Sequence, residues 1–153
     1  MTLLLFLHIT GSVLFLGNII TAAFWKVRAD VRGDAAEIHR TVNNVMLADY
    51  AFTLPGLLLL IVTGSLMAAK GGYSLAGLNW LTASLILFGI TGVLWLAVLI
   101  PLQRGMIRLS RQALENGTIS AAYKKLSAYW AVFGILATLL PLFILYFMVS
   151  KPF

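Results

Sequence analysis

LSAYWAVFGILATLLPLFILYFMVS, residues 126–150, contains no Asp, Glu, Lys or Arg and is long enough to cross a bilayer as one helix. Three other uncharged runs, at residues 1–25, 50–69 and 71–103, share this property. A helix needs roughly 20 apolar residues to span a hydrocarbon core of about 30 Å. The four runs therefore predict an all-α fold, an integral membrane four-helix bundle that forms a single transmembrane domain over residues 1–153.

The composition excludes most other classes of protein. Of the 153 residues, 61% are hydrophobic and 10% are charged, whereas a soluble domain is typically about half apolar and about a quarter charged. The net charge of +6 comes without a separate soluble domain, so no nucleic-acid partner is predicted. The chain has no cysteine and no soluble-enzyme motif, so no metal site is predicted and the question of enzymatic activity stays open.

The basic residues predict how the chain is threaded. Most of them lie between the first and second runs or between the third and fourth: Lys26, Arg28, Arg32, Arg40, Arg104, Arg108, Arg111, Lys124 and Lys125. By the positive-inside rule both of these connections are cytoplasmic. Both termini are then periplasmic, and the protein is expected in the bacterial inner membrane as a multi-pass protein.

Turn and capping signals extend the helices beyond the apolar runs. Asp34 and Glu37 follow Gly33 with the spacing of a reciprocal capping box, Asn116-Gly117 is a strong helix stop, and Thr118 or Ser120 is expected to cap the last helix. The predicted helices cover residues 2–32, 35–69, 78–115 and 119–149. Helices 2 to 4 reach into the cytosol, and Pro55, Pro101 and Pro141 are expected to kink them.

Asp49 is the acidic residue closest to the apolar interior, where such a group is costly. Asn18 and Thr53 are predicted to share a polar membrane site with it. Its available partners lie near the cytoplasmic ends of the helices: Asn18, Lys26, Gln103, Arg104 and Lys125. Two interpretations remain open, an ion pair that fixes the register of the helices and a proton or substrate relay.

His8 is the second candidate, in a stripe of small and polar residues on the first helix. It lies about 9 Å from the outer end of that helix, far from Asp49, so the two cannot form a dyad. A neutral imidazole is a common axial ligand of haem iron, so haem b is a candidate cofactor. Met67 and Met148 are candidate second ligands from the outer halves of the other helices. A hydrogen-bonded packing role for His8 is the alternative.

Tryptophans and tyrosines near the ends of the runs fit interfacial belts. Trp25, Tyr129 and Trp130 are assigned to the inner belt, and Tyr73 and Trp80 to the outer one. Trp95 lies deeper, where it either packs or contributes to a site. The predicted cytoplasmic face carries Arg104, Arg108 and Arg111 on one helix side, which indicates binding of anionic phospholipid from the bilayer.

The motifs Leu7-His8-Ile9-Thr10-Gly11, Asp49-Tyr50-Ala51-Phe52-Thr53-Leu54-Pro55-Gly56 and Lys151-Pro152 resemble an uncharacterised bacterial family of predicted four-helix integral membrane proteins. The chain is also distantly similar to the bacterial four-helix membrane protoporphyrinogen IX oxidases through His8, the Pro55 region and the closing Lys151-Pro152-Phe153. This second resemblance implies a haem-binding pocket at His8.

Two functional hypotheses follow. The first is a haem- or porphyrin-binding membrane protein with His8 as axial ligand. The second is a non-enzymatic membrane subunit or a small ion- or proton-coupled transporter that uses Asp49, with a homo-oligomer or another membrane protein as partner.

Overall fold

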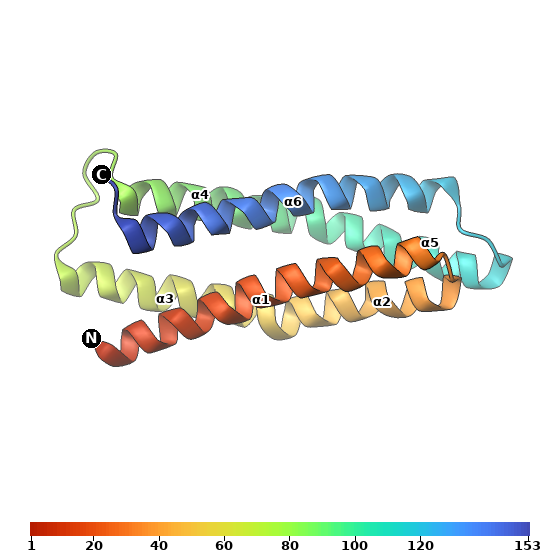
Figure 1. Ribbon diagram of the computed structural model, residues 1–153, viewed down its shortest axis with the longest axis horizontal. Coiled ribbons are helices and arrows are strands. Elements are labelled where there is room, and N and C mark those ends of the chain that lie inside the picture. The colour runs from red at the N-terminus through yellow and green to blue at the C-terminus, as the bar shows by residue number, and fades with distance from the viewer.

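The structure is a computed structural model that describes residues 1–153, and it contains helices and no strand (Figure 1). Its elements are α1 (Thr2–Arg32), α2 (Ala35–Ala48), η1 (Asp49–Thr53), α3 (Leu54–Gly71), α4 (Trp80–Leu94), η2 (Trp95–Leu99), α5 (Ile100–Asn116) and α6 (Ala121–Ser150), where η1 and η2 are π-helical. They join into four rods, each long and apolar enough to cross a membrane. The predicted all-α fold with four membrane helices is confirmed.

The two tight turns lie at the same end of the bundle. Gly33 ends α1 with φ 74°, and Asp34 then caps α2 by accepting a hydrogen bond from the Glu37 amide at 2.7 Å. The predicted return bond from Glu37 is not made, because its carboxylate pairs with Arg32 at 2.8 Å. At the second turn Ser120, not Thr118, caps α6.

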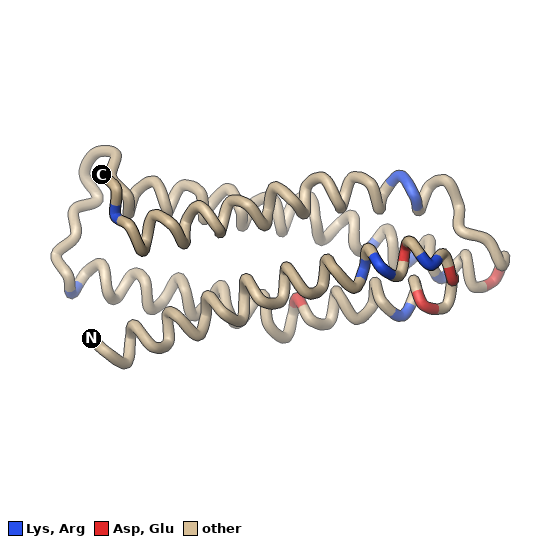
Figure 2. Tube along the Cα trace, in the orientation of Figure 1, with Lys and Arg blue, Asp and Glu red and all other residues tan.

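Almost all charges gather around these two turns (Figure 2). We call this part of the bundle, where α1 meets α2 and α5 meets α6, the charged end, and the opposite part, with residues 72–79 and both termini, the loop end. The buried core also lies mainly toward the charged end, where α2 packs against α5. The side of the membrane that each end faces stays a prediction.

Toward the loop end the rods separate into two pairs. There α1 packs against α3 and α4 against α6, while α3 packs against neither α4 nor α6. Two glycines bring α1 and α3 together, since a Cβ on Gly56 would lie 2.9 Å from the Gly11 carbonyl oxygen. The first pair is therefore fixed by a close backbone contact.

Two of the four rods, Ala35–Gly71 and Trp80–Asn116, change from α to π geometry near their middle. The Leu54 amide donates to the Asp49 carbonyl, and the Ile100 amide donates to the Trp95 carbonyl, five residues back in each case. A proline follows directly in both rods, at Pro55 and Pro101. Such π-helical turns are rare and often occur at functional sites. The predicted proline kinks themselves stay predictions.

Candidate functional site

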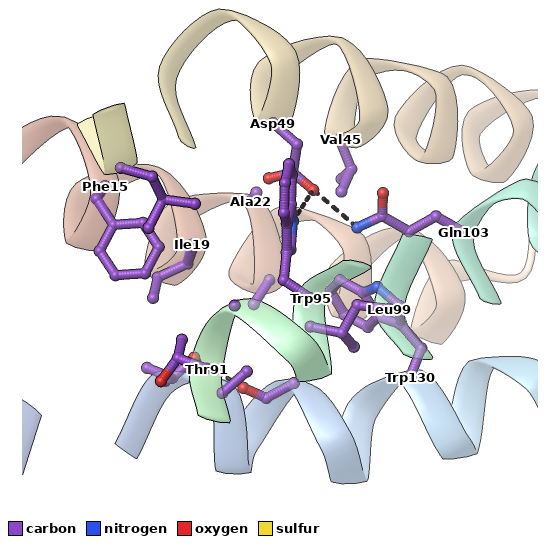
Figure 3. Close-up of a pocket in the computed structure, with 16 residues that line it drawn as sticks. Phe15, Ile19, Ala22, Val45, Asp49, Thr91, Trp95, Leu99, Gln103 and Trp130 are labelled. Carbon is purple, nitrogen blue, oxygen red and sulfur yellow. Dashed lines mark hydrogen bonds between the residues drawn. The ribbon is translucent and has the colours of Figure 1, made fainter. Parts of the chain in front are cut away.

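Asp49 opens the η1 segment and points between the helices (Figure 3). Its Oδ1 accepts hydrogen bonds from Asn18 Nδ2 at 3.1 Å and Thr53 Oγ1 at 2.9 Å. Its Oδ2 accepts from Gln103 Nε2 at 2.9 Å and from Trp95 Nε1 at 3.5 Å. The residue is 4% exposed, so one buried carboxylate joins groups from α1, η1, η2 and α5.

Asn18 and Thr53 form one side of this cluster. The Asn18 amide nitrogen donates both to Asp49 and, at 2.9 Å, to Thr53 Oγ1. Thr53 follows Asp49 by one turn and is fully buried. The structure thus brings together the three residues of the predicted polar membrane site.

No basic side chain reaches Asp49. Of the predicted basic partners, Lys26 pairs with Asp30 at 2.6 Å, and Arg104 and Lys125 are exposed and in no ion pair. The negative charge of an ionised Asp49 is therefore balanced only by N–H and O–H dipoles of neutral groups. These hydrogen bonds pair both oxygens of the carboxylate without a counter-ion.

A cavity of about 50 Å³ adjoins the carboxylate. Gln103 and Trp130 line it toward the charged end, and the Thr91 and Thr138 hydroxyls line it toward the loop end. At roughly 1.5 Å per residue, Trp130 and Thr138 lie about 12 Å apart along α6, and Gln103 and Thr91 lie about 18 Å apart along their rod. The cavity is thus narrow, elongated and partly polar.

Trp130 departs from its predicted place in an interfacial belt. Its side chain is buried and its ring lies 4.9 Å from the Lys26 ammonium group. Spacing on α6 offered a signal for this burial, because Tyr123, Ser127, Trp130, Gly134 and Ala137 recur every three or four residues. That face lies toward α1 and the cavity.

A second buried polar cluster lies nearer the charged end and was not predicted. Asp30 Oδ2 accepts from Lys26 at 2.6 Å and from Ser127 at 2.6 Å, and Asp30 Oδ1 accepts from the Tyr123 hydroxyl at 2.7 Å. Lys26 also donates to Ser127 and is 1% exposed. The cluster joins α1 to α6 with every charge paired.

His8 lies on the α1–α3 pair, away from Asp49. Its Nδ1 is 2.9 Å from Thr63 Oγ1, and the Thr63 hydroxyl itself donates to the Leu59 carbonyl. Thr63 Oγ1 must therefore accept from Nδ1–H, which leaves a lone pair on Nε2 of the neutral ring. Gly64 makes room for the ring, since a Cβ there would lie 3.2 Å from His8 Cε1.

The two candidate methionines lie in different places. Met67 follows Thr63 by one turn on α3, on the same helix face. Met148 lies on α6, which does not pack against α3. Of the two, Met67 is on the helix pair that carries His8.

The three arginines of the predicted lipid face are exposed on α5, and none takes part in an ion pair. Arg104, Arg108 and Arg111 recur at spacings of four and three residues, so they share one side of the helix. They form a positively charged stripe beside the charged end.

Comparison with functionally curated proteins and with solved structures gave no match, and the similarity to protoporphyrinogen oxidases stays a prediction. One family model, described as a predicted integral membrane protein (DUF2269), matches residues 2–152. Because this match covers nearly the whole chain, the protein belongs to the DUF2269 family of integral membrane proteins.

Proposed function

We propose that this protein is proton-coupled, either a small transporter or the membrane subunit of one, and that Asp49 binds and releases the proton. The observation that supports this proposal is the set of four neutral donors around a buried carboxylate with no basic partner. A carboxylate paired with lysine or arginine would leave a buried cation behind on protonation. Asp49 gains a proton without that cost.

Gln103 allows both protonation states to be hydrogen-bonded. In the charged state its Nε2 donates to Asp49 Oδ2. When hydronium gives a proton to Oδ2 and leaves as water, rotation of the Gln103 amide places Oε1 as the acceptor of the new O–H. An amide carries both a donor and an acceptor, so the carboxyl group keeps a partner before and after the transfer.

The donors around Asp49 favour a proton over a metal cation. Each carboxylate oxygen faces two N–H or O–H groups, and their positive ends would repel a cation bound at the same oxygens. A proton needs only one lone pair and leaves the other donors in place.

Proton flux into liposomes tests the proposal. Wild-type protein should collapse an imposed pH gradient faster than empty liposomes, and Asp49→Asn should reduce the flux to the empty-liposome rate. Glu115→Gln, the same change at an exposed acid in no ion pair, serves as the matched control and should behave as wild type. Equal flux in Asp49→Asn and wild type would overturn the proposal.

Haem binding at His8 is a second candidate function. Its support is the Nδ1–H bond to Thr63, because histidines that ligate a metal usually donate their other ring N–H to a fixed acceptor. His8 Nε2 would hold the iron, and Met67 is the methionine on the same helix pair. Bound haem would supply electron transfer or ligand binding at its iron.

A visible spectrum tests this second candidate. Protein purified after expression with a haem precursor should show a Soret band that Thr63→Val weakens and His8→Ala abolishes. The absence of the band, or a band unchanged in His8→Ala, contradicts haem binding at this residue.

The stripe of Arg104, Arg108 and Arg111 is proposed to bind anionic phospholipid, with the charged end in the cytoplasm of a bacterium and the bundle in its inner membrane. Each basic residue near an anionic surface contributes about 1 kcal/mol. Changing the three arginines to Gln should reduce the phosphatidylglycerol that is retained in detergent, as counted by native mass spectrometry. Lys70→Gln, at the loop end, is the control, and unchanged retention in the triple variant argues against the proposal.

The charged end is also proposed to dock a second copy or another membrane protein, since α2 and α5 carry charges of both signs there. Gentle detergent extraction followed by size analysis should recover a complex. Recovery only as an isolated monomer counts against this role.

A further inference from the structure

Two buried polar atoms near Asp49 have no hydrogen-bond partner. They are Gln103 Oε1, an acceptor, and Trp130 Nε1, a donor. The two residues are 3% and 6% exposed, and both line the cavity beside Asp49. An unpaired buried polar atom costs about 1–3 kcal/mol, so this pair points to a ligand that the cavity holds.

Gln103 Oε1 needs a hydrogen-bond donor, and Trp130 Nε1 needs an acceptor. Water can donate to Gln103 Oε1 and can accept from Trp130 Nε1, so water molecules in the cavity satisfy both atoms. A water molecule needs roughly 10–15 Å³ of such volume and two to four polar partners. The cavity of about 50 Å³ therefore has room for a few water molecules but not for an organic substrate.

The positions of Gln103 and Trp130 indicate toward which end of the bundle the water-filled cavity leads from Asp49. Figure 3 shows Gln103 and Trp130 on the same side of Asp49, opposite Phe15 and toward the charged end. The Lys26 ammonium group lies over the Trp130 ring, 4.9 Å from its centroid. Trp130 thus stands between Asp49 and the Lys26–Asp30 pair.

We propose that this cavity is a water and hydronium site that connects Asp49, through Gln103 and Trp130, to the charged end of the bundle. The inference rests on the proposed function of Asp49 and adds the route of its proton. Hydronium enters from the charged end, gives its proton to Asp49 and leaves water between Gln103 and Trp130.

The buried charged groups along this route carry almost no net charge, because they form an ion pair. On α1, Lys26 and Asp30 neutralise each other at 2.6 Å. His39 on α2 is bonded to Ser110 of α5 at 2.8 Å. The remaining basic residues of the charged end are exposed: Arg28, Arg32, Arg40, Arg104, Arg108, Arg111, Lys124 and Lys125.

Nitrogen-15 NMR of the indole N–H groups in lipid nanodiscs tests the proposal. The chain has four tryptophans, and the resonances of Trp95 and Trp130 are identified by their loss in Trp→Phe variants. In unmodified protein the Trp130 N–H should show a cross-peak to water. Its absence in a correctly folded sample would falsify the water site.

Two variants separate a water site from general damage. Gln103→Leu removes the acceptor and should weaken the Trp130 cross-peak, whereas Gln103→Glu keeps an oxygen there and should retain it. Trp130→Phe should slow proton flux several-fold while Asp49 still titrates. Unchanged flux in Trp130→Phe overturns the route.

Trp95 reports separately on the proposed function, because its N–H faces Asp49. Its resonance should move as pH changes and become independent of pH in Asp49→Asn. A titrating Trp95 without water at Trp130 rejects the route and leaves the function of Asp49 standing. Water at Trp130 with a Trp95 signal independent of pH rejects the proton function of Asp49.

Discussion

Asp30 and Asp49 lie in the same bundle, but only Asp30 has a counter-ion. The partners of Asp30 are Lys26, Tyr123 and Ser127, whereas those of Asp49 are the neutral Asn18, Thr53, Trp95 and Gln103. Lys26 pairs with the first carboxylate, and the cluster around it joins α1 to α6. Under the proposed function, the second carboxylate changes its charge. The comparison therefore sets a carboxylate with a counter-ion against one without.

The largest effect is expected when the Lys26–Asp30 pair is broken. Lys26→Met leaves Asp30 partly buried without a counter-ion, which should lower the free energy of unfolding by about 3–5 kcal/mol. Unfolding in mixed detergent micelles measures this change. The double variant Lys26→Met/Asp30→Leu should recover most of the loss, because no unpaired charge remains. A single variant within about 1 kcal/mol of wild type would show that the pair behaves as an exposed one.

At Asp49 the loss of unfolding free energy should depend on which residue replaces the aspartate and not on the loss of its charge. Asp49→Leu leaves the donors of Asn18, Gln103 and Trp95 unpaired, and we expect a loss of about 1–3 kcal/mol in unfolding free energy relative to Asp49→Asn. Asn keeps one acceptor oxygen, so it should fold nearly as well as wild type while it abolishes proton flux. Equal stability of the two variants would mean that the surrounding donors find water or other partners.

We expect the contact between α1 and α3 to set the distance from Asn18 to Asp49. Disturbing this contact should therefore change the surroundings of Asp49 and leave those of Asp30 unchanged. Gly56→Ala places a Cβ 2.9 Å from the Gly11 carbonyl oxygen, and such overpacking typically costs about 1–3 kcal/mol. The Trp95 indole resonance should shift, while the contacts of Asp30 stay unchanged. Gly17→Ala is the control, because nothing lies within 4 Å of that Cβ. The same response from both glycines would refute the idea of a specific contact.

Much of the fold could be predicted from the sequence because the bilayer imposes it. Long uncharged runs specify helices, since backbone groups in lipid must be satisfied within the segment. Gly33 and Gly117 end helices with positive φ, and only a residue without a Cβ takes that conformation easily. Asn18, Asp49 and Thr53 could be grouped because they are polar residues at similar depth in neighbouring helices.

Other features of the site depend on contacts that no pattern of residues encodes. An i to i−5 bond leaves no signature in the periodicity, so the π-helical turns that begin at Asp49 and Trp95 were not predicted. Lys26 had acids on two helices within reach, and Asp30 one turn away on α1 is its partner. Trp130 near the end of an apolar run fits a lipid interface as well as a core, and only its packing against α1 decides between them.

The smallest change in unfolding free energy is expected when one hydroxyl group is removed from either cluster. Thr53 donates to Asp49 at 2.9 Å and Ser127 donates to Asp30 at 2.6 Å. Thr53→Val and Ser127→Ala should each lower the unfolding free energy by about 0.5–1 kcal/mol, as for single hydrogen bonds between membrane helices. Only Thr53→Val should alter proton flux and the pH response of Trp95, because Ser127 donates to a carboxylate that is paired with Lys26. If Ser127→Ala changes the flux as much as Thr53→Val does, the two aspartates belong to one coupled system and the distinction between them is lost.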